Sequence, residues 1–353
     1  MKIIDRYIAR VVVGGTLTAL LLVVGLSVFF NLIGEIEDVG EGGYTLLKML
    51  ATVVLTIPNS MYELFPVATL LGSLIGMGML ASNSELIAMR ASGLSIWRIV
   101  LSVMQAGVIM LLVAVLLGEF VAPMAEQTAQ QLRVSATDTR VSFMGNRGLW
   151  VRDDKLFINA SKVISENTLA DITVYEFDDE ARLKVATRAA SARYRKGQWV
   201  LHKVQQSEFG KDSVQVHHIE KLSRDSLLTP ELLGIVVLKP EDMSARDISQ
   251  FMGYLEDNGL DTQQYRYALL GRFITPLSAL LMLFVSVPFV FGGLRSVSTG
   301  QRLFIGIMVG FGFYILSQIS GQMGRVYDLN PLLATLTPSV IFLLIGIRAV
   351  RRL

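Results

Sequence analysis

Long apolar runs separated by short polar segments dominate the sequence. Residues 11–33 are apolar almost throughout. As a helix they would rise about 34 Å, enough to cross a hydrocarbon core of about 30 Å with some tilt. Further runs of this kind lie at 46–81, 99–122, 269–294, 303–320 and 332–347. The pattern predicts six membrane-spanning helices.

The second run is too long for a simple span. Residues 46–81 would form a helix of about 54 Å, well beyond the thickness of the core. Two passes would put the arginines of the following loop outside, against the bias of cytoplasmic loops toward Lys and Arg. We therefore expect one helix that bends at Pro58 or Pro66. Glu63 then lies near the outer leaflet, where its carboxylate either faces a wet cavity or a partner, or simply reaches the interface.

The charges that flank the runs indicate the orientation. Residues 1–10 are basic and residues 34–41 are acidic, which predicts a cytoplasmic N-terminus. Residues 82–98, 295–302 and 348–352 carry the other clusters of arginine beside the runs. All of them fall on the cytoplasmic side if there are six spans. The first run lacks a small-x-small cleavage site, so we expect it to be retained as a span.

A segment of different character separates the third and fourth runs. Residues 126–240 contain short stretches of β-branched and aromatic residues separated by turn residues, which predicts an all-β sandwich or jelly roll outside the membrane. Residues 244–258 have the apolar stripe of an amphipathic helix. The predicted fold class is an α+β membrane protein, six transmembrane helices with an inserted periplasmic β-jelly-roll domain. Its expected parts are residues 1–123, 124–242 and 243–353.

A polar and amphipathic stretch, residues 82–98, interrupts the apolar pattern. Ser82 with Glu85 has the spacing of a capping box, and Gly93 is a helix stop. A helix of about two turns is too short to be stable alone in water, so it must lie on something. One interpretation is an interfacial helix anchored by Trp97 and Arg98 at the headgroups. The other is a coupling helix that docks on a partner ATPase, with Glu85 as its exposed charge.

Composition excludes several classes of function. The chain is 52% hydrophobic with a mean hydropathy of +0.50, which is typical of an integral membrane protein. It has no cysteine, and His217 and His218 would point to opposite faces of one strand, so we expect no metal site and no cofactor. There is no P-loop, no H-E-x-x-H and no G-x-S-x-G, and no basic patch for nucleic acid. We expect a non-catalytic protein whose energy comes from a partner.

Three stretches carry a resemblance to a known family. They are residues 4–7 (IDRY), 83–95 (NSELIAMRASGLS) and 265–277 (YRYALLGRFITPL). Together with the order of spans and β domain they resemble the LptF/LptG family, the permease subunits of the lipopolysaccharide export ABC transporter. The resemblance covers the whole chain, and the chain looks more like the LptG type. It implies a heterodimer with an LptF-like permease subunit, an LptB-like ATPase dimer on the coupling helices, an LptC-like membrane-anchored jelly-roll protein and a Gram-negative inner membrane.

The resemblance also suggests roles for individual residues. Glu85 matches the acidic residue of the coupling helix that contacts the ATPase, and Arg90 and Gly93 lie in the same motif. Basic residues at the outer end of the first span would be expected to meet lipid A phosphates, but residues 35–41 are acidic. Either these carboxylates bind through divalent cations, or other cations contact the phosphates. The candidates for the second case, each of which is alternatively an ordinary interfacial anchor, are Lys48, Arg133, Arg272 and Arg325.

A lipid substrate makes physical demands on such a protein. Burial of acyl chain is worth about 0.8 kcal/mol per CH₂, so a lipid with several chains is held by on the order of tens of kcal/mol. Extraction is feasible only if the chains pass from bilayer to apolar cavity to apolar β groove. Besides Glu63, the residues expected to line the path are Phe29, Phe30, Phe65, Phe313 and Ile315. The alternatives are an exporter of another lipid or of lipoprotein, and a membrane-anchored periplasmic scaffold.

Overall fold

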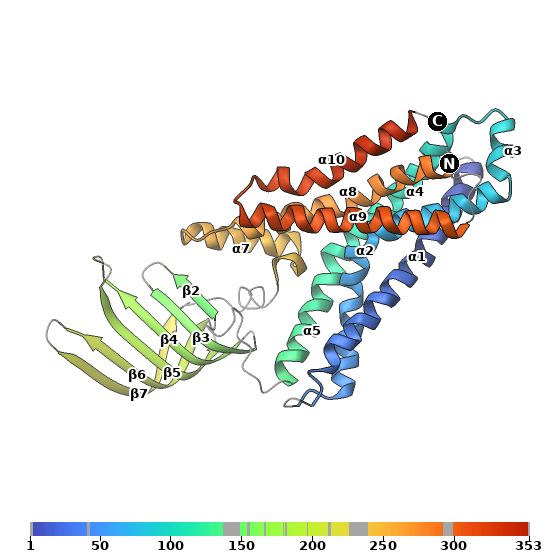
Figure 1. Ribbon diagram of the computed structural model, residues 1–353. Helices are drawn as coiled ribbons and strands as arrows, with labels where there is room; N and C mark the ends of the chain where they lie inside the picture. The colour runs from blue at the N-terminus through green and yellow to red at the C-terminus, as the bar shows by residue number, and fades with distance from the viewer. Residues whose placement is uncertain are drawn as a thin grey trace.

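The computed structural model describes residues 3–351, apart from 41–42, 137–148, 154–155, 166, 179, 181, 196, 211–212, 226–238 and 292–298. A long helical body carries an antiparallel sheet at one end (Figure 1). Both chain termini lie at the other end of the body, close to the short helix α3 (Glu85–Ala91). We call the end of the body that carries the sheet the sheet end, and the end where both chain termini lie the terminal end.

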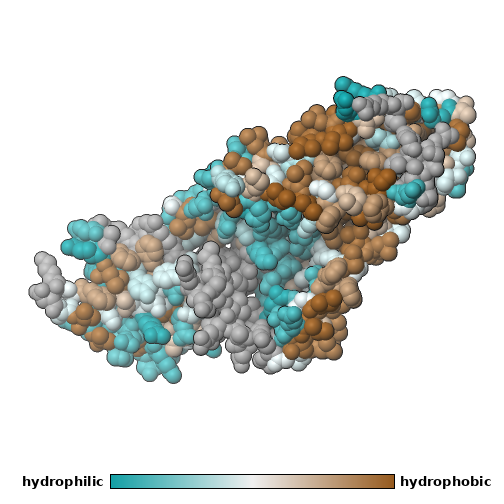
Figure 2. Space-filling model, viewed as in Figure 1, coloured by the Kyte–Doolittle hydropathy of each residue, from teal (hydrophilic) through white to brown (hydrophobic). Residues whose placement is uncertain are grey.

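Six helices in the described part of the chain are long and apolar enough to cross a membrane, as predicted. The elements that contain them are α1 (Ile3–Ile36), α2 (Leu46–Ser82), α4 (Ile96–Leu116) with its continuation, α8 (Gln263–Phe291), α9 (Thr299–Val326) and α10 (Pro331–Val350). Figure 2 shows hydrophobic side chains over much of the helical body, hydrophilic ones at its terminal end, and a hydrophilic area on the side of the body that faces the sheet. This distribution suits a body surrounded by lipid. Residues 295–298 of the basic loop expected at 295–302 lie outside the described residues, and 299–302 form the start of α9.

Helix α2 is a single helix, as its length and charges predicted, with Pro58 and Pro66 inside it. It packs against α1 with glycines at the contact. A Cβ atom on Gly72 would lie 2.2 Å from the Cα of Thr16, and one on Gly15 would lie 2.2 Å from the carbonyl oxygen of Gly72. Only glycine permits such an approach, so the two backbones are in direct contact.

The third span differs from the prediction at its sheet end. The apolar run predicted a third span over 99–122 that ends before Pro123, but α4 continues through a π-helical turn, η1 (Leu117–Val121), into α5 (Ala122–Ala136). The amide of Ala122 donates to the carbonyl of Leu117. In the same hydrogen-bond pattern the next residue, Pro123, would donate to the carbonyl of Gly118, but proline has no N–H. Arg272 supplies the missing donor, with its Nη1 2.9 Å from the carbonyl oxygen of Gly118.

The β domain is an antiparallel sheet inserted between the two helical halves, as predicted. Its strands follow one another in chain order: β2 (Leu149–Asp153), β3 (Leu156–Ser165), β4 (Thr168–Phe177), β5 (Leu183–Arg195), β6 (Gln198–Phe209) and β7 (Val214–Asp225). Among the described residues these strands make one layer, and the second layer of a sandwich or jelly roll is not seen there. Trp199, Leu201 and Val174 lie in the core on one face.

A line of irregular residues crosses this sheet. Asp171 in β4 and Lys203 in β6 have positive φ angles, 48° and 51°. The strands stay in register past both, but the alternation of faces is interrupted: Leu169 and Ile172, three residues apart, are buried in the same core. The interruption lets long strands curve, as Figure 1 shows.

Helix α7 (Ala245–Asp257) joins the sheet to the helical body, in agreement with the amphipathic helix expected at 244–258. It buries Ile248, Phe251 and Leu255. Tyr254 packs against both the core of the sheet and the cluster around α7. Residues 239–244, which we call the strap, precede α7 and include the 3₁₀ turn η2 (Pro240–Asp242).

Candidate functional site

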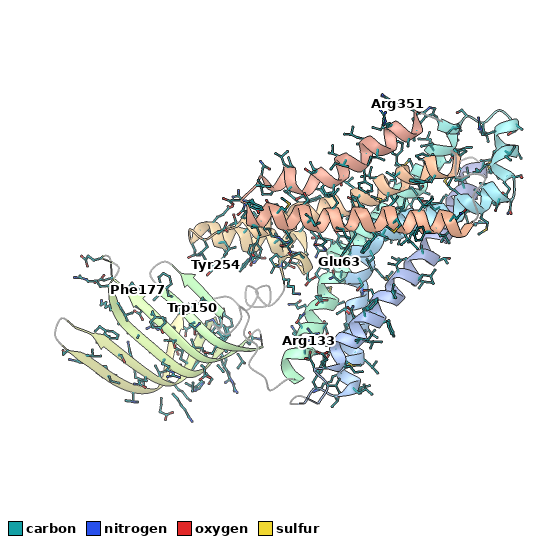
Figure 3. All side chains as sticks on the ribbon, in the orientation of Figure 1. Glu63, Arg133, Trp150, Phe177, Tyr254 and Arg351 are labelled. Atoms are coloured by element: carbon teal, nitrogen blue, oxygen red, sulfur yellow. The ribbon has the colours of Figure 1, made fainter. Side chains whose placement is uncertain are left out.

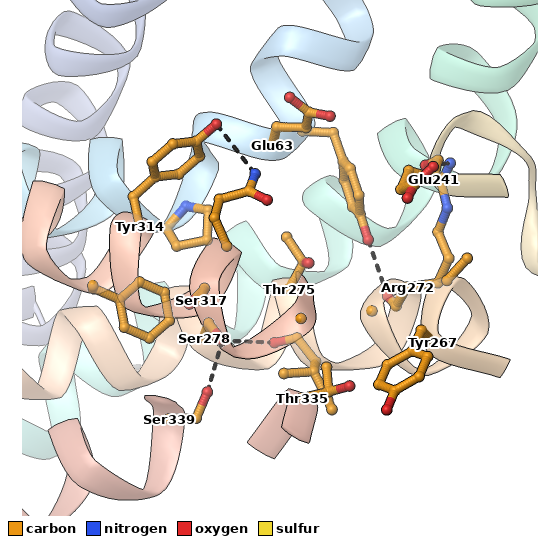
Figure 4. A pocket seen from close by; sticks show the side chains of 18 of the residues that line it. Glu63, Glu241, Tyr267, Arg272, Thr275, Ser278, Tyr314, Ser317, Thr335 and Ser339 are labelled. Atoms are coloured by element: carbon orange, nitrogen blue, oxygen red, sulfur yellow. Dashed lines mark hydrogen bonds between the residues drawn. The ribbon is translucent and has the colours of Figure 1, made fainter. Parts of the chain in front are cut away.

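A cavity of about 250 Å³ opens between α2, α8, α9, α10 and the strap (Figure 4). Four charged side chains line it: Glu63 from α2, Glu241 from the strap, Arg272 from α8 and Arg325 from α9. Its uncharged polar lining includes Thr275, Ser278, Tyr314, Ser317, Gln318, Thr335 and Ser339. We call it the polar pocket. It brings together Glu63, Arg272, Arg325 and Phe313, four of the residues that the sequence singled out for substrate binding.

Arg272 connects several elements beside the polar pocket. Arg272 is only 8% exposed. Its Nη2 donates to the carbonyl oxygen of Glu241 at 2.8 Å. Its other terminal nitrogen holds the carbonyl of Gly118 described above. The guanidinium lies 5.0 Å from the ring centroid of Tyr62, whose hydroxyl donates to the carbonyl of Arg272 at 3.0 Å. Arg272 therefore fixes the strap and the π turn relative to α8.

Arg325 has a more open setting, in the last turn of α9. One terminal nitrogen, Nη1, forms an ion pair with the carboxylate of Glu241. The two side chains remain 30% and 45% exposed. The Nε of Arg325 is buried and has no hydrogen-bond partner among the described residues.

The strap and the first turn of α7, which follows it, are each held at one further point. The side-chain amide of Asn59, in α2, donates to Asp242 Oδ1 at 2.8 Å. Glu119, in the π turn, accepts from the amides of Ala245 at 2.9 Å and Arg246 at 3.3 Å. A carboxylate at the first turn of α7 satisfies its free N–H groups and the helix dipole. Burial raises the pKa of the Asp242 carboxyl above its ordinary value.

Two predicted phosphate-binding cations lie away from this pocket. Figure 3 shows Arg133 low on α5, apart from Glu63. Arg133 forms an ion pair with Glu35 of α1, and Glu35 also accepts from the hydroxyl of Tyr44 at 2.9 Å. The Nζ of Lys48 donates to the carbonyl of Gly43 at 3.0 Å. Glu35, in the acidic segment 35–41 where basic residues were expected, therefore neutralises Arg133.

The predicted apolar lining residues are dispersed. Phe29 and Phe30, on α1, are 56% and 61% exposed, and Ile315, on α9, is 40% exposed. Phe65 is buried in the core of the helical body. Phe313 alone of the five lines the polar pocket. Within the described residues they do not surround one cavity.

Helix α3 projects at the terminal end of the body (Figure 1), but it starts differently from the prediction. It begins at Glu85, and Ser84 precedes it with a φ angle of 62° and no side-chain cap. Ser82 is the last residue of α2 rather than a cap, and its hydroxyl donates to the carbonyl of Met79 at 2.9 Å. The predicted capping box of Ser82 and Glu85 is therefore wrong, because α2 extends through Ser82, the residue that was expected to cap α3.

The end of α3 agrees with the prediction. Gly93 has a φ angle of 91°, and its amide donates to the carbonyl of Arg90 at 3.0 Å. The amide of Leu94 donates to the carbonyl of Met89 at 3.2 Å. These two bonds define a Schellman motif, which favours glycine at this position. Arg90 itself is exposed.

Glu85 is held by the N-terminal helix. The hydroxyl of Tyr7 donates to Glu85 Oε2 at 2.6 Å. Leu86 is buried and attaches α3 to the body, and a groove of about 340 Å³ lies beside it, lined by residues including Arg90 and Phe291. The charge of Glu85 is thus presented at the terminal end in a fixed position.

A buried ion pair beneath α3 was missed by reasoning from the sequence. Arg98, expected among the charges of an interfacial stretch, instead donates from Nη2 to both carboxylate oxygens of Asp5, at 2.9 and 2.8 Å. The hydroxyl of Ser102 donates to Asp5 Oδ1 at 2.7 Å, and Asp5 is 3% exposed. The only signal in the sequence that Asp5 matters was its place in residues 4–7, one of the three stretches that carry the family resemblance. Among the described residues no three His, Asp or Glu side chains gather as a metal site requires.

Comparison with known proteins gives matches along almost the whole chain. The family model of lipopolysaccharide export system permease LptF/LptG matches residues 6–352. The lipopolysaccharide export system permease protein LptG of Escherichia coli (strain K12) is 33% identical over 349 residues, which is 98% of this chain and 97% of the relative. LptG of Haemophilus influenzae (strain ATCC 51907 / DSM 11121 / KW20 / Rd) is 32% identical over 343 residues, 96% of each chain.

Proposed function

Because the chain belongs to the lipopolysaccharide export system permease family LptF/LptG, we propose that a separate ATPase subunit drives it from the terminal end. The chain is a multi-pass membrane protein with the permease role in lipopolysaccharide export, and its relatives are of the LptG type, as the resemblance implied. The match extends over both helical halves and the sheet. The whole chain, rather than one part, therefore carries this role.

The position of α3 supports the proposed coupling. A seven-residue helix has little stability of its own, yet α3 is fixed by Leu86, by the Tyr7–Glu85 hydrogen bond and by its Schellman motif. It presents Glu85 and Arg90 beyond the ends of the apolar helices. A force applied to α3 would reach α1 through Tyr7 and α2 through the short connection at Asn83 and Ser84.

The apolar surfaces support a second permease subunit. In the apolar 18-residue segments of α9 and α10, only 17% and 22% of the residues are buried within the chain. Lipid and a second helical subunit both suit such surfaces. The partners we propose are an LptF-like permease subunit, an LptB-like ATPase dimer on α3 and its counterpart, and an LptC-like membrane-anchored jelly-roll protein.

The proposed orientation has the terminal end in the cytoplasm and the sheet in the periplasm of a Gram-negative cell. The basic residues near α3 and the C-terminus favour the cytoplasmic side. The sheet, with its apolar core on one face, would take lipid from the helical body and pass it toward the outer membrane. Such a path keeps acyl chains out of water, which is the main free-energy cost of extraction.

The exposed α3 with Glu85 is the single observation that carries the ATPase coupling, and Glu85→Lys tests it. In proteoliposomes that contain the complete complex, we expect this variant to hydrolyse ATP without releasing lipopolysaccharide to an acceptor. Ser92→Lys places the same side chain at an exposed position of the same segment, with a charge change of +1 instead of +2, and should transport nearly as well as the wild type. Wild-type transport by Glu85→Lys would remove the coupling proposal.

A further inference from the structure

Residues 4–7, the first of the three stretches that carry the family resemblance, lie in the first turns of α1, beside α3 (Figure 1). Two side chains of this stretch bond to two different helices, Asp5 to α4 and Tyr7 to α3. We propose that Tyr7 is a positioning residue for coupling, whose hydroxyl holds the carboxylate of Glu85 at the place where the ATPase subunit meets it. This role rests on the proposed function of α3.

Little else fixes the direction in which α3 points. Ser84 before it and Gly93 after it have left-handed φ angles, 62° and 91°, so the chain turns sharply at both ends. Leu86 is the only buried residue of α3. Among the described residues, the bond between Tyr7 and Glu85 is the only hydrogen bond from a side chain of α3 to another helix. Apolar contacts have no preferred direction, so this bond determines where Glu85 points.

Tyr7 can hold Glu85 because the residues before and after it are anchored. Asp5 is 3% exposed and accepts two hydrogen bonds from Arg98 and one from Ser102, both on α4. Ile8 is fully buried in the core of the helical body. The phenol, which is itself exposed, therefore projects from a fixed turn of α1. Side chains thus connect α3 to α1 and α4 independently of the main chain between these helices.

The bond from Tyr7 leaves Glu85 able to bind a partner. The phenol donates to Oε2 at 2.6 Å, whereas the side-chain amide of Asn83 is 3.4 Å from Oε1, which is long for a hydrogen bond. A carboxylate has about four acceptor positions, so a cation of the ATPase subunit can bind Oε1 while Tyr7 stays on Oε2. A carboxylate that is already ordered costs less to bind. It also transmits a push to α1 and α4, where a free side chain would rotate instead.

The test measures the lipopolysaccharide released to an acceptor per ATP hydrolysed, in proteoliposomes that contain the complete complex. Tyr7→Phe removes one hydroxyl and should lower this ratio about threefold to tenfold, the equivalent of one hydrogen bond. Its melting temperature should equal that of the wild type, because the lost bond is exposed to water. A change of coupling without a change of stability is what a merely structural role would not produce.

Tyr44→Phe is the matched control. The hydroxyl of Tyr44 also donates to a glutamate of α1, Glu35, at 2.9 Å, but at the sheet end and with Tyr44 only 1% exposed. This variant should lose thermal stability and keep the ratio of transport to hydrolysis. An equal fall of the ratio in Tyr7→Phe and Tyr44→Phe would overturn the inference, because it would reflect the loss of any such bond.

Glu85→Asp separates the position of the carboxylate from its charge. The side chain keeps its charge but is shorter by one methylene, which withdraws the carboxylate from Tyr7. This variant should lower the ratio about as much as Tyr7→Phe, and the double variant should be no worse than either single one, since both changes remove the same contact. A further threefold to tenfold loss in the double variant would mean that Tyr7 acts elsewhere, which would overturn the inference.

Failure of this inference differs from failure of the proposed function. A wild-type ratio in Tyr7→Phe, together with uncoupled hydrolysis in Glu85→Lys, overturns the positioning role and leaves the coupling at α3 intact. Wild-type transport by Glu85→Lys removes the coupling itself, and the role of Tyr7 with it.

Discussion

Two of the arginine–carboxylate pairs that join distant parts of the described chain lie at opposite ends of the helical body, and they differ in the burial of the carboxylate. At the terminal end Arg98 meets both oxygens of Asp5, which is 3% exposed and has a third partner in Ser102. At the sheet end Arg325 meets Glu241 through one nitrogen, and both side chains are partly exposed.

The difference assigns the two ends different mechanical properties. A buried carboxylate with all its partners in place is costly to disturb, because separation leaves a charge without water or a counterion. An exposed pair exchanges protein contacts for water at little cost. The terminal end therefore suits the transmission of force from α3, whereas the ion pair at the sheet end can open and close at little cost.

Removal of Asp5 should have the largest effect. Asp5→Ala removes a buried carboxylate that pairs with Arg98 and accepts from the hydroxyl of Ser102, and we expect a loss of about 3 kcal/mol in stability. Thermal unfolding in detergent measures it. Asp5→Asn keeps the size and a hydrogen-bond acceptor and should lose less. An unchanged melting temperature in Asp5→Ala would show that the terminal end is not held by this pair.

The glycine contact between α1 and α2 should come next. In Gly72→Ala the new methyl group would meet the backbone of Thr16, which cannot rotate away, so the helices must separate at a cost of about 2 kcal/mol. Gly14→Ala is the control, because nothing lies within 4 Å of a Cβ built there. Equal melting temperatures for the two variants would contradict the close contact.

The exposed pair should contribute least to stability. Glu241→Gln should change the free energy of unfolding by no more than about 1 kcal/mol, since exposed ion pairs are worth little. A loss as large as that of Asp5→Ala, measured under the same conditions, would erase the distinction between the two ends.

The pH dependence gives a smaller effect of known sign. Burial raises the pKa of Asp242 in the folded protein, so the folded state binds the proton more tightly than the unfolded state. Stability from this group falls as pH rises from the unfolded pKa through the folded one. Asp242→Asn keeps an acceptor for Asn59 and should gain stability at neutral pH while losing this dependence. Pulsed proteolysis across pH 4–8 measures it, and a loss of stability at neutral pH would contradict the sign.

Asp178 provides the opposite case in the sheet. Hydrogen bonds from the backbone amide and side chain of Arg182 lower the pKa of Asp178. Its contribution is present above the unfolded pKa and is lost as pH falls through the folded one. Asp178→Asn should therefore weaken the protein at neutral pH and not in acid, the reverse of Asp242→Asn.

The spans were predictable because an apolar run of span length is a strong local signal, and charge alone decided that α2 is one helix. The ion pairs were not, because Asp5 and Arg98 are 93 residues apart and Arg325 and Glu241 are 84 apart. Local spacing carries no information on such pairs. The continuation of the third span past Pro123 depends on a donor from Arg272, which no local pattern reveals.

The central claim is that the two ends face opposite sides of the membrane, one driven and one handling the lipid. The chain has no cysteine, so single cysteines report their own positions. We would label Ala91→Cys, on α3, and Glu208→Cys, on β6, with a membrane-impermeant maleimide in intact cells. The account predicts that Glu208→Cys reacts at once and Ala91→Cys only after the inner membrane is opened. Reaction of Ala91→Cys in intact cells would contradict both the orientation and the site of the motor.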